Sequence, residues 1–175
     1  MSSEMFSEIV IRKALPEESS RLGDIAYEAW ERGILPLLSE APGLRSGERR
    51  RLAAAAHEML DRIIVAEVEG VAVGWCSRSR GRPYIPFLFV TPEYQSHGVG
   101  SALLRRMESM LELEGESRVL LETPADNVRA VHFYERQGYH ILALKADGRA
   151  QPGPLVSIRL EKRLNPFKGP VTDVD

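Results

Sequence analysis

Residues 94–107 read YQSHGVGSALLRRM, with glycines at positions 98 and 100 where an apolar strand pattern gives way to a helical one. Glycine adopts backbone conformations that other residues avoid, and it lets another molecule come close to the main chain. The first turn of a helix exposes N–H groups that have no acceptor within the helix. Together these features predict a binding seat for an anion, above all a phosphate. Two glycines would also suit a tight turn that binds nothing, so residues outside this stretch have to distinguish the two interpretations.

The bulk properties indicate one ordinary domain and exclude several classes of function. A chain of 175 residues with 43% hydrophobic and 27% charged residues can form a single domain with its own core. A net charge of −2 gives no reason to expect binding to nucleic acid or to a membrane surface. The single cysteine, Cys76, cannot form a disulfide within the chain, and the first residues lack the pattern of a secretory signal. We therefore expect a soluble, cytoplasmic protein.

The pattern of apolar residues predicts a mixed α/β fold. Strands are expected at residues 9–14, within 62–77 as a hairpin that turns at Glu69-Gly70, and at 84–90, 118–123, 139–145 and 155–163. Helices are expected at 16–32, 48–60, 98–114 and 127–137, with a long irregular connection at 34–47. Pro86 interrupts the strand at 84–90, because proline cannot donate to the ladder. Hairpins beside crossover helices favour a mixed layer of about seven strands over a doubly wound sheet, in one domain at 1–163 with a tail at 164–175.

Three known phosphate-binding patterns can be compared with the glycine-containing stretch. A P-loop needs Gly-x4-Gly-Lys-Ser/Thr, and the sequence contains no such string. The dinucleotide fingerprint needs a third glycine where this chain has Leu103. The third pattern, Gln/Arg-x-x-Gly-x-Gly/Ala, is met in full by Gln95-Ser96-His97-Gly98-Val99-Gly100. In this pattern the chain resembles the GNAT superfamily of acyl-CoA-dependent N-acyltransferases.

A second stretch strengthens the resemblance. Asn127, Ala130, Phe133-Tyr134-Glu135 and Gly138-Tyr139 are similar to the superfamily's second motif, and residues 88–94 resemble its approach from strand to loop. The order of the expected elements also agrees, from residue 8 to about residue 163. The resemblance implies a mostly antiparallel central sheet with flanking helices, splayed between the fourth and fifth strands to admit the cofactor.

The resemblance also implies how acetyl-CoA is held. Backbone N–H groups of residues 95–101 would hold the pyrophosphate, and backbone groups of the preceding strand would pair with the pantetheine arm. The residues implied in cofactor binding are Leu88, Phe89, Val90, Gln95, Ser96, His97, Gly98, Val99, Gly100, Ser101, Asn127, Ala130 and Tyr134. His97 departs from the pattern, in which glycine or arginine is frequent, but it keeps the backbone donors. No metal is expected, because the histidines show no metal-ligand spacing.

Two residues are candidates for the chemistry. The resemblance implies that Tyr134 is the general acid that protonates the departing thiolate, and the alternative for Tyr134 is a core aromatic residue. Asn127 lies seven residues earlier, about two helical turns, which would bring both side chains to one face. Glu122 ends a strand at a spacing from Tyr134 similar to that of the catalytic glutamate in bacterial enzymes that acetylate protein N-termini. As alternatives to a role as base, Glu122 would cap the sheet edge or bind an arginine. Weaker candidates for the base are Glu67, Glu69 and Tyr84.

The sequence thus predicts an acyltransferase that moves an acetyl group from acetyl-CoA to a primary amine by direct attack in a ternary complex. No residue lies where a covalent nucleophile would be expected. A small molecule is the favoured acceptor, chosen by the connection at 34–47, and a peptide N-terminus is the alternative because of Glu122. A sensor module that binds acyl-CoA without catalysis is a further alternative, against which the presence of Tyr134 argues. Whether the chain forms a homodimer is left open.

Overall fold

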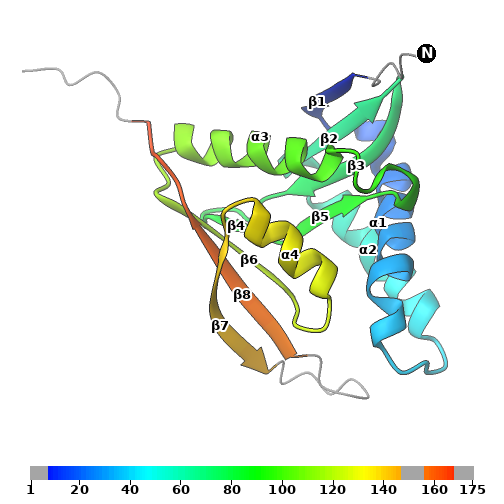
Figure 1. Ribbon diagram of the computed structural model, residues 1–175. Coiled ribbons are helices and arrows are strands. Elements are labelled where there is room, and N and C mark those ends of the chain that lie inside the picture. The colour runs from blue at the N-terminus through cyan, green and yellow to red at the C-terminus, as the bar shows by residue number, and fades with distance from the viewer. Residues whose placement is uncertain (1–7, 147–155, 168–175) are drawn as a thin grey trace, which may run out of the picture.

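The computed structural model describes residues 8–146 and 156–167, in which strands and helices follow the predicted order (Figure 1). The strands are β1 (Ile9–Lys13), β2 (Ile63–Val68), β3 (Val71–Ser77), β4 (Tyr84–Ile85), β5 (Phe87–Val90), β6 (Arg118–Pro124), β7 (His140–Ala146) and β8 (Val156–Arg163). The α-helices are α1 (Ser19–Gly33), α2 (Leu44–Glu58), α3 (Val99–Leu113) and α4 (Val128–Arg136). Short 3₁₀ turns lie at Pro16–Glu18, Leu35–Leu37, Leu60–Arg62 and Pro92–Tyr94.

The strands form two four-stranded sheets that separate at Pro86. One sheet has the order β1-β2-β3-β5 and is antiparallel throughout. The other has the order β4-β6-β8-β7, in which β4 runs parallel to β6 and the remaining pairs are antiparallel. The predicted strand at 84–90 is therefore two strands, one in each sheet, with the proline between them. The mixed, mostly antiparallel fold and its splay beside this strand are confirmed, and the division at Pro86 accounts for the eighth strand among the described residues.

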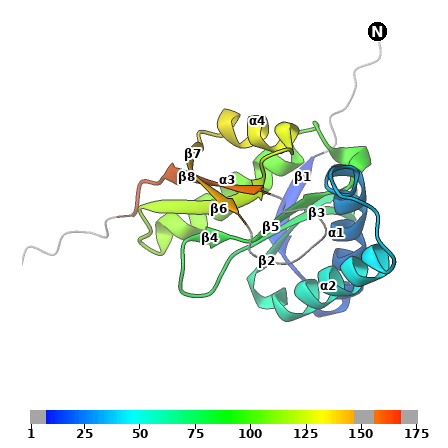
Figure 2. The same ribbon diagram turned by 90° about the horizontal axis from the view of Figure 1, so that it is seen from below.

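Helices cover both faces of the first sheet (Figures 1 and 2). Successive side chains of β3 point to opposite faces, so Trp75 packs in the core beneath α1 and α2 whereas Cys76 packs in the core beneath α3. Both side chains are fully buried. The indole N–H of Trp75 donates to the carbonyl of Leu22 in α1 at 2.8 Å, which ties that helix to the sheet. Burial raises the pKa of the Cys76 thiol far above its usual range.

Helix α2 begins at Leu44, four residues earlier than the predicted start at residue 48. Gly43 precedes it with φ of 80°, a left-handed conformation in which a residue with a Cβ is strained. The irregular connection is correspondingly shorter than expected, and it contains the 3₁₀ turn Leu35–Leu37.

The predicted C-terminal tail starts with residues that pack on the domain. Leu164 is buried, and its N–H donates to the carbonyl of Ser117 at 2.9 Å. The N–H of Phe167 donates to the carbonyl of Glu112 at 2.9 Å, so this segment is fastened to the end of α3. The rest of the predicted tail, residues 168–175, lies outside the described residues.

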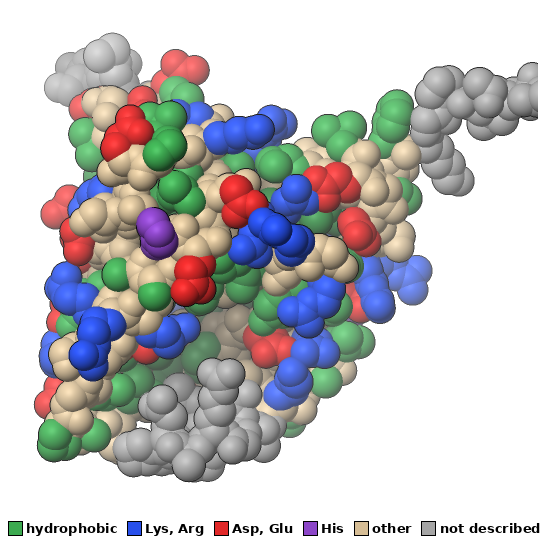
Figure 3. Space-filling view, turned by 180° about the vertical axis from the view of Figure 1, so that it is seen from behind, with side chains coloured by type: hydrophobic (Ala, Val, Ile, Leu, Met, Phe, Trp, Pro, Cys, Tyr) green, Lys and Arg blue, Asp and Glu red, His purple; other side chains and the backbone are tan. Residues whose placement is uncertain are grey.

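The surface carries charges of both signs. Seen from behind, acidic and basic side chains are interspersed over the elements, with no broad region of one sign (Figure 3). Across residues 8–146 and 156–167, no helix combines the length and the apolar character needed to cross a bilayer.

Candidate active site

A run of open backbone donors lies between β5 and α3. The first hydrogen bond of the helix joins the N–H of Ala102 to the carbonyl of Gly98 at 3.0 Å. The N–H groups of residues 96–101 donate to no acceptor among the described residues. Ser96 and Gly98 have φ of 65° and 84°, so the backbone turns sharply twice just before α3. The donors that an anion would need are therefore open at the entrance of α3, and the anion seat itself stays a prediction.

The side chains around this loop leave its donors open. Gln95 turns inward, and its Nε2 donates to the carbonyl of Val90 at 3.0 Å. The ring of His97 folds back, with Nδ1 at 2.8 Å from the carbonyl of Gln95. A Cβ at Gly98 would meet no atom within 4 Å, whereas a Cβ at Gly100 would lie 3.3 Å from the ring of Phe133. The two glycines thus have different roles, because Gly98 allows the turn and Gly100 allows α3 and α4 to approach.

Helix α4 is joined to this loop by two side-chain hydrogen bonds that the sequence did not predict. Arg129 Nη2 donates to Ser96 Oγ at 3.1 Å, and Gln137 Nε2 donates to Ser101 Oγ at 3.0 Å. These bonds hold the start and the end of α4 against the loop of open donors.

Strand β5 is an edge strand of the first sheet, so half of its backbone groups have no strand partner. The N–H of Thr91 donates to Val73 at 2.9 Å, and in the antiparallel register the hydrogen-bonded residues alternate along the strand. Phe89 is therefore bonded to β3, whereas the backbone groups of Leu88 and Val90 point into the splay. The carbonyl of Val90 is already taken by Gln95. Leu88, Phe89 and Val90 were expected to pair with a pantetheine arm, but the backbone groups of Phe89 are already hydrogen-bonded to β3.

Asn127 precedes α4 and caps it, instead of lying within it as expected. Its Oδ1 accepts a hydrogen bond from the N–H of Ala130 at 3.3 Å, which satisfies one of the free donors of the first turn. The side-chain nitrogen Nδ2 of Asn127 donates to no acceptor among the described residues and remains available to a ligand, whereas the backbone N–H donates to the carbonyl of Pro124 at 3.0 Å.

Tyr134 is half-buried on α4. Its ring packs edge-on against Phe133 and Tyr139, with centroid distances of 5.2 and 5.8 Å. Within the described part of the chain, its hydroxyl makes no hydrogen bond. Burial raises the pKa of Tyr134 above its usual value, so the phenol stays protonated at neutral pH and has a proton to donate.

Glu122 on β6 is bound by two cations. Arg159 donates to Oε1 from Nε at 2.8 Å and from Nη2 at 2.6 Å, and Lys145 donates to the same oxygen at 3.0 Å. Burial alone would raise the pKa of Glu122, but the two cations hold it below its usual range. Arginine binding, one of the alternatives from the sequence, is thus present. Oε2 accepts no hydrogen bond from the described residues.

A cavity of about 730 Å³ brings most of these groups together. It opens onto the splay, and both Tyr134 and Glu122 line it. His97 and Val99 do not line it; His97 is exposed and Val99 is buried in the core. The lining residues with an expected role in cofactor binding are Leu88, Phe89, Val90, Gln95, Ser96, Gly98, Gly100, Ser101, Asn127, Ala130 and Tyr134. Trp30, which the sequence offers for the wall of an acceptor pocket or for the core, and Ile34 of the 34–47 connection also line it. Sequence reasoning missed Arg32, Phe87 and Gln137, which belong to no motif and reach the cavity through tertiary packing. The weaker candidate Glu67 lies elsewhere and binds Arg12 at 2.7 Å.

Residues 24–139 match the sequence model of the family described as the acetyltransferase (GNAT) family. The chain belongs to this family. An acetyltransferase of Photorhabdus laumondii is 33% identical over 76 residues, which are 43% of this chain and 52% of that protein. The match thus spans about half the length of the curated relative.

Solved GNAT structures share the fold. A GCN5-related N-acetyltransferase from Rhodopseudomonas palustris superposes with a TM-score of 0.73 at 20% identity, covering 93% of this chain and 100% of that one. The PaiA N-acetyltransferase from Thermoplasma acidophilum, solved in complex with coenzyme A, has a TM-score of 0.74 at 20% identity over 89% of this chain and 99% of that one.

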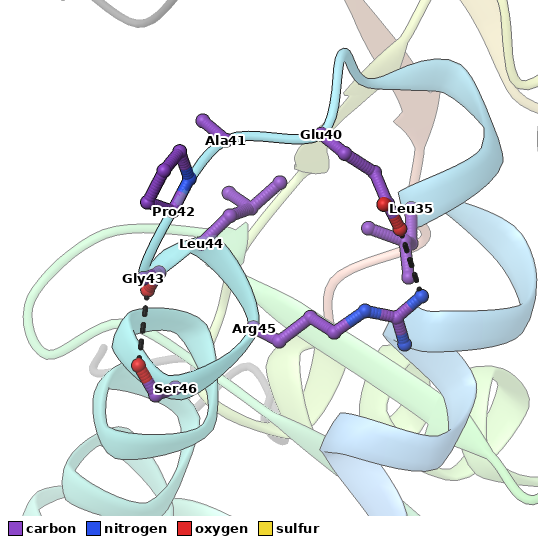
Figure 4. Close-up of a pocket in the computed structure, with 8 residues that line it drawn as sticks. All are labelled: Leu35, Glu40, Ala41, Pro42, Gly43, Leu44, Arg45 and Ser46. Carbon is purple, nitrogen blue, oxygen red and sulfur yellow. Dashed lines mark hydrogen bonds and ion pairs between the residues drawn. The ribbon is translucent and has the colours of Figure 1, made fainter.

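The connection before α2 forms a second cavity in this GNAT protein, of about 540 Å³ (Figure 4). Arg45 reaches across it to Glu40 at 3.0 Å and also binds Glu31 of α1 at 2.5 Å. The hydroxyl of Ser46 donates to the carbonyl of Gly43 at 3.2 Å. The start of α2 is therefore fastened to the end of α1, beside the α1 residues that line the larger cavity.

Proposed function

We propose that this GNAT protein transfers the acetyl group of acetyl-CoA to a primary amine of a small molecule by direct attack in a ternary complex. One observation carries the proposal: a single cavity is lined by residues of the open donor segment after β5, by the edge strand β5 and by Tyr134. A binding module would need the first two features, whereas a protonated phenol beside them is suited to catalysis.

The chain's groups fit the parts of acetyl-CoA. The open N–H groups of residues 96–101 are donors for a pyrophosphate, and the partial positive charge of the α3 entrance adds to their attraction. The N–H groups of Leu88 and Val90 and the carbonyl of Leu88 suit the amides of a pantetheine arm laid along β5. When bound, acetyl-CoA supplies an activated thioester.

Tyr134 is the proposed general acid. Its phenol is protonated at neutral pH, as any tyrosine of ordinary pKa is, and burial raises its pKa further. The hydroxyl is not engaged by another described residue. It can therefore give its proton to the sulfur as the thioester bond breaks. Tyr134 would regain this proton from solvent after the product leaves.

Glu122 is the proposed base, acting from Oε2 through water. It attracts the acceptor's ammonium group and, through water, takes the proton that this group must lose before the neutral amine can attack. Since Arg159 and Lys145 lower the pKa of Glu122, the carboxylate is a weak base, and we place its contribution at the lower end of the range for general acid–base catalysis, about 10²-fold.

The test begins with the phosphate seat. Asn and Asp tolerate left-handed φ better than other residues with a Cβ, so Gly98→Asn and Gly98→Asp place side chains of nearly equal size in the same open space. Only the aspartate adds a negative charge beside the donors. We expect the Kd for acetyl-CoA, measured by calorimetry, to rise about tenfold more in Gly98→Asp than in Gly98→Asn.

Equal affinities in the two variants would contradict the placement of the pyrophosphate. Transfer itself is measured as thiol release from acetyl-CoA with a panel of amines and peptides. Tight binding of acetyl-CoA with no thiol release from any acceptor would overturn the proposed activity in favour of a sensor.

A further inference from the structure

The side of the cavity that faces α1 has no part in the chemistry proposed above. Trp30, Arg32 and Ile34 from α1 and its C-terminal end line it, together with Phe87 and Phe89 from β5. Helix α1 packs directly along β5, as both ribbon views show (Figures 1 and 2). This part of the wall is therefore left to contact the acceptor.

The wall contains a preformed aromatic surface. Phe87 and Phe89 lie two residues apart on β5 and point to the same face, with ring centroids 5.6 Å apart and an interplanar angle of 23°. Both rings contact Trp75 edge-on, with ring-centroid distances of 5.9 Å for Phe87 and 5.1 Å for Phe89. Trp75 is fully buried and hydrogen-bonded, so it fixes the two rings, which are themselves only half-buried. The guanidinium of Arg51 also lies over the Phe87 ring, with its Cζ 5.9 Å from the centroid. A flat apolar group can pack against the parts of the two rings that these neighbours leave exposed.

Two side-chain donors on α1 line the same cavity. Trp30 is 5% exposed and lines the cavity, and its indole N–H donates to no acceptor among the described residues. Arg32 is exposed at the cavity wall and pairs with no carboxylate in the described part of the chain. An unpaired indole N–H and an unpaired guanidinium together suit an anionic oxygen.

The charge balance around the acceptor's position also favours an anion over a second cation. Glu122 is the lining carboxylate on this side, and its charge is already met by Lys145 and Arg159. Together with Arg32, the side chains of Glu122, Lys145 and Arg159 carry an excess of positive charge. An acceptor with several ammonium groups would be repelled, whereas one amine accompanied by a carboxylate would not.

We propose that the acceptor is a small aromatic amino carboxylate. Its ring stacks on Phe87 and Phe89, its carboxylate meets Arg32 and the indole N–H of Trp30, and its amine faces Glu122 Oε2. This inference rests on the proposed acetyl transfer and names the acceptor class of the same site. In the transfer, the acceptor's ammonium first loses a proton through water toward Glu122. The neutral amine then forms the C–N bond as the thioester C–S bond breaks; the nitrogen loses a second proton to water, and the sulfur gains one from Tyr134.

Four amines separate the features of the proposed acceptor. Phenylalanine has the ring and the carboxylate, phenethylamine lacks the carboxylate, alanine lacks the ring, and spermidine carries several ammonium groups. We expect the kcat/KM for phenylalanine to exceed that for phenethylamine and for alanine by about tenfold or more, and spermidine to be the poorest acceptor. Calorimetric titration of each amine into the protein saturated with coenzyme A measures binding without turnover.

Two variants with matched controls assign the contacts. Arg32→Ala should lower kcat/KM about tenfold for phenylalanine and leave phenethylamine nearly unchanged, whereas loss for both amines would mean that Arg32 serves the cofactor and would contradict its assigned contact. Phe87→Leu should weaken both aromatic amines. The controls make the same changes away from the cavity, Arg50→Ala on exposed α2 and Phe167→Leu in the exposed C-terminal segment, and should leave all four amines unaffected.

The two proposals fail in different ways. Turnover of spermidine or alanine as efficient as that of phenylalanine would support acetyl transfer and overturn the acceptor class. Binding of phenylalanine to the protein loaded with coenzyme A, with no thiol released from acetyl-CoA by any amine, would support the ligand class and contradict the acetyl transfer.

Discussion

Tyr134 and Tyr139 are two phenols whose ring centroids lie 5.8 Å apart and whose hydroxyls have different surroundings. Tyr139 is buried, and its hydroxyl donates to Glu108 Oε1 at 2.9 Å. Lys162 completes this buried group by donating to the other oxygen of Glu108 at 2.7 Å. The hydroxyl of Tyr134 has no such partner within the described residues and lines the cavity. The same side-chain chemistry is thus used once for stability and once, we propose, for catalysis.

Replacing each tyrosine by phenylalanine should separate these roles. Tyr134→Phe removes the proton donor, so we expect kcat to fall about 10²–10⁴-fold with little change in the affinity for acetyl-CoA. Tyr139→Phe leaves Glu108 short of a donor, so we expect a loss of about 1–3 kcal/mol in the free energy of unfolding and near-normal turnover well below the melting temperature. Unchanged turnover in Tyr134→Phe, measured when chemistry limits the rate, would mean that Tyr134 is a core aromatic residue with no part in catalysis.

Glu122→Gln should lower both the turnover and the melting temperature, and the two effects should depend on pH in different ways. The glutamine cannot take a proton at neutral pH, so turnover should fall most near pH 7 and recover as the pH approaches the pKa of the acceptor amine. A defect that persists at high pH would contradict the role as base.

The stability of the same variant follows from the lowered pKa of Glu122. A carboxyl whose pKa is lower in the folded than in the unfolded chain stabilises the fold above the unfolded value of about 4.3, and this contribution is lost as the pH falls through the folded value. The melting temperature of Glu122→Gln should therefore lie below that of the wild type at pH 7, and the difference should shrink as the pH falls below about 4.3 and vanish once the pH is below the folded value. A constant difference across this range would mean that the ion pairs with Arg159 and Lys145 contribute nothing to stability.

At the scale of single elements, β5 has two kinds of backbone amide in alternation. Phe89 is bonded to β3, and Leu88 and Val90 face the splay. In the free protein the amide hydrogens of Leu88 and Val90 should exchange with solvent faster than that of Phe89. Acetyl-CoA should slow the exchange of Leu88, Val90 and the amides of residues 96–101, as measured by NMR. Protection of Leu88 before the cofactor is added would contradict the assigned register.

The elements that the sequence predicted well are those set by local signals. The hairpin at Glu69-Gly70 has φ of 51° and 78° at its two turn residues, as a tight two-residue turn requires. Pro86 divides the strand at 84–90 because its missing N–H is a local property. The start of α2 was missed, since the glycine that allows it to begin at Leu44 was interpreted as part of a loop.

The site was predicted where it rests on a motif and missed where it rests on packing. The glycine pattern predicted the open donors, because a helix entrance exposes them whatever lies around it. The cations on Glu122 come from positions 23 and 37 residues away, on strands whose register the sequence does not reveal. The aromatic wall likewise depends on which faces of α1 and β5 meet.

At the scale of the whole molecule, the proposed cofactor would lie between the two sheets and contact elements of both. A ligand that binds only the folded chain stabilises it by mass action, about 2.7 kcal/mol at a hundred times its Kd. For a chain of this size we expect acetyl-CoA at that concentration to raise the melting temperature by roughly 5–10 °C. Pantetheine, which lacks the phosphates, should raise it less at equal concentration. Equal shifts would argue that residues 96–101 do not hold the pyrophosphate.

The buried thiol of Cys76 can report the rate at which the core opens. Because burial disfavours the thiolate, the reactive form, an alkylating reagent should not modify the native protein. Labelling then requires the opening of the core beneath α3, and since the sequence holds one cysteine, each modified chain records one such event. Mass spectrometry of the alkylated fraction over time would give the opening rate, and a ligand that joins the two sheets should slow it.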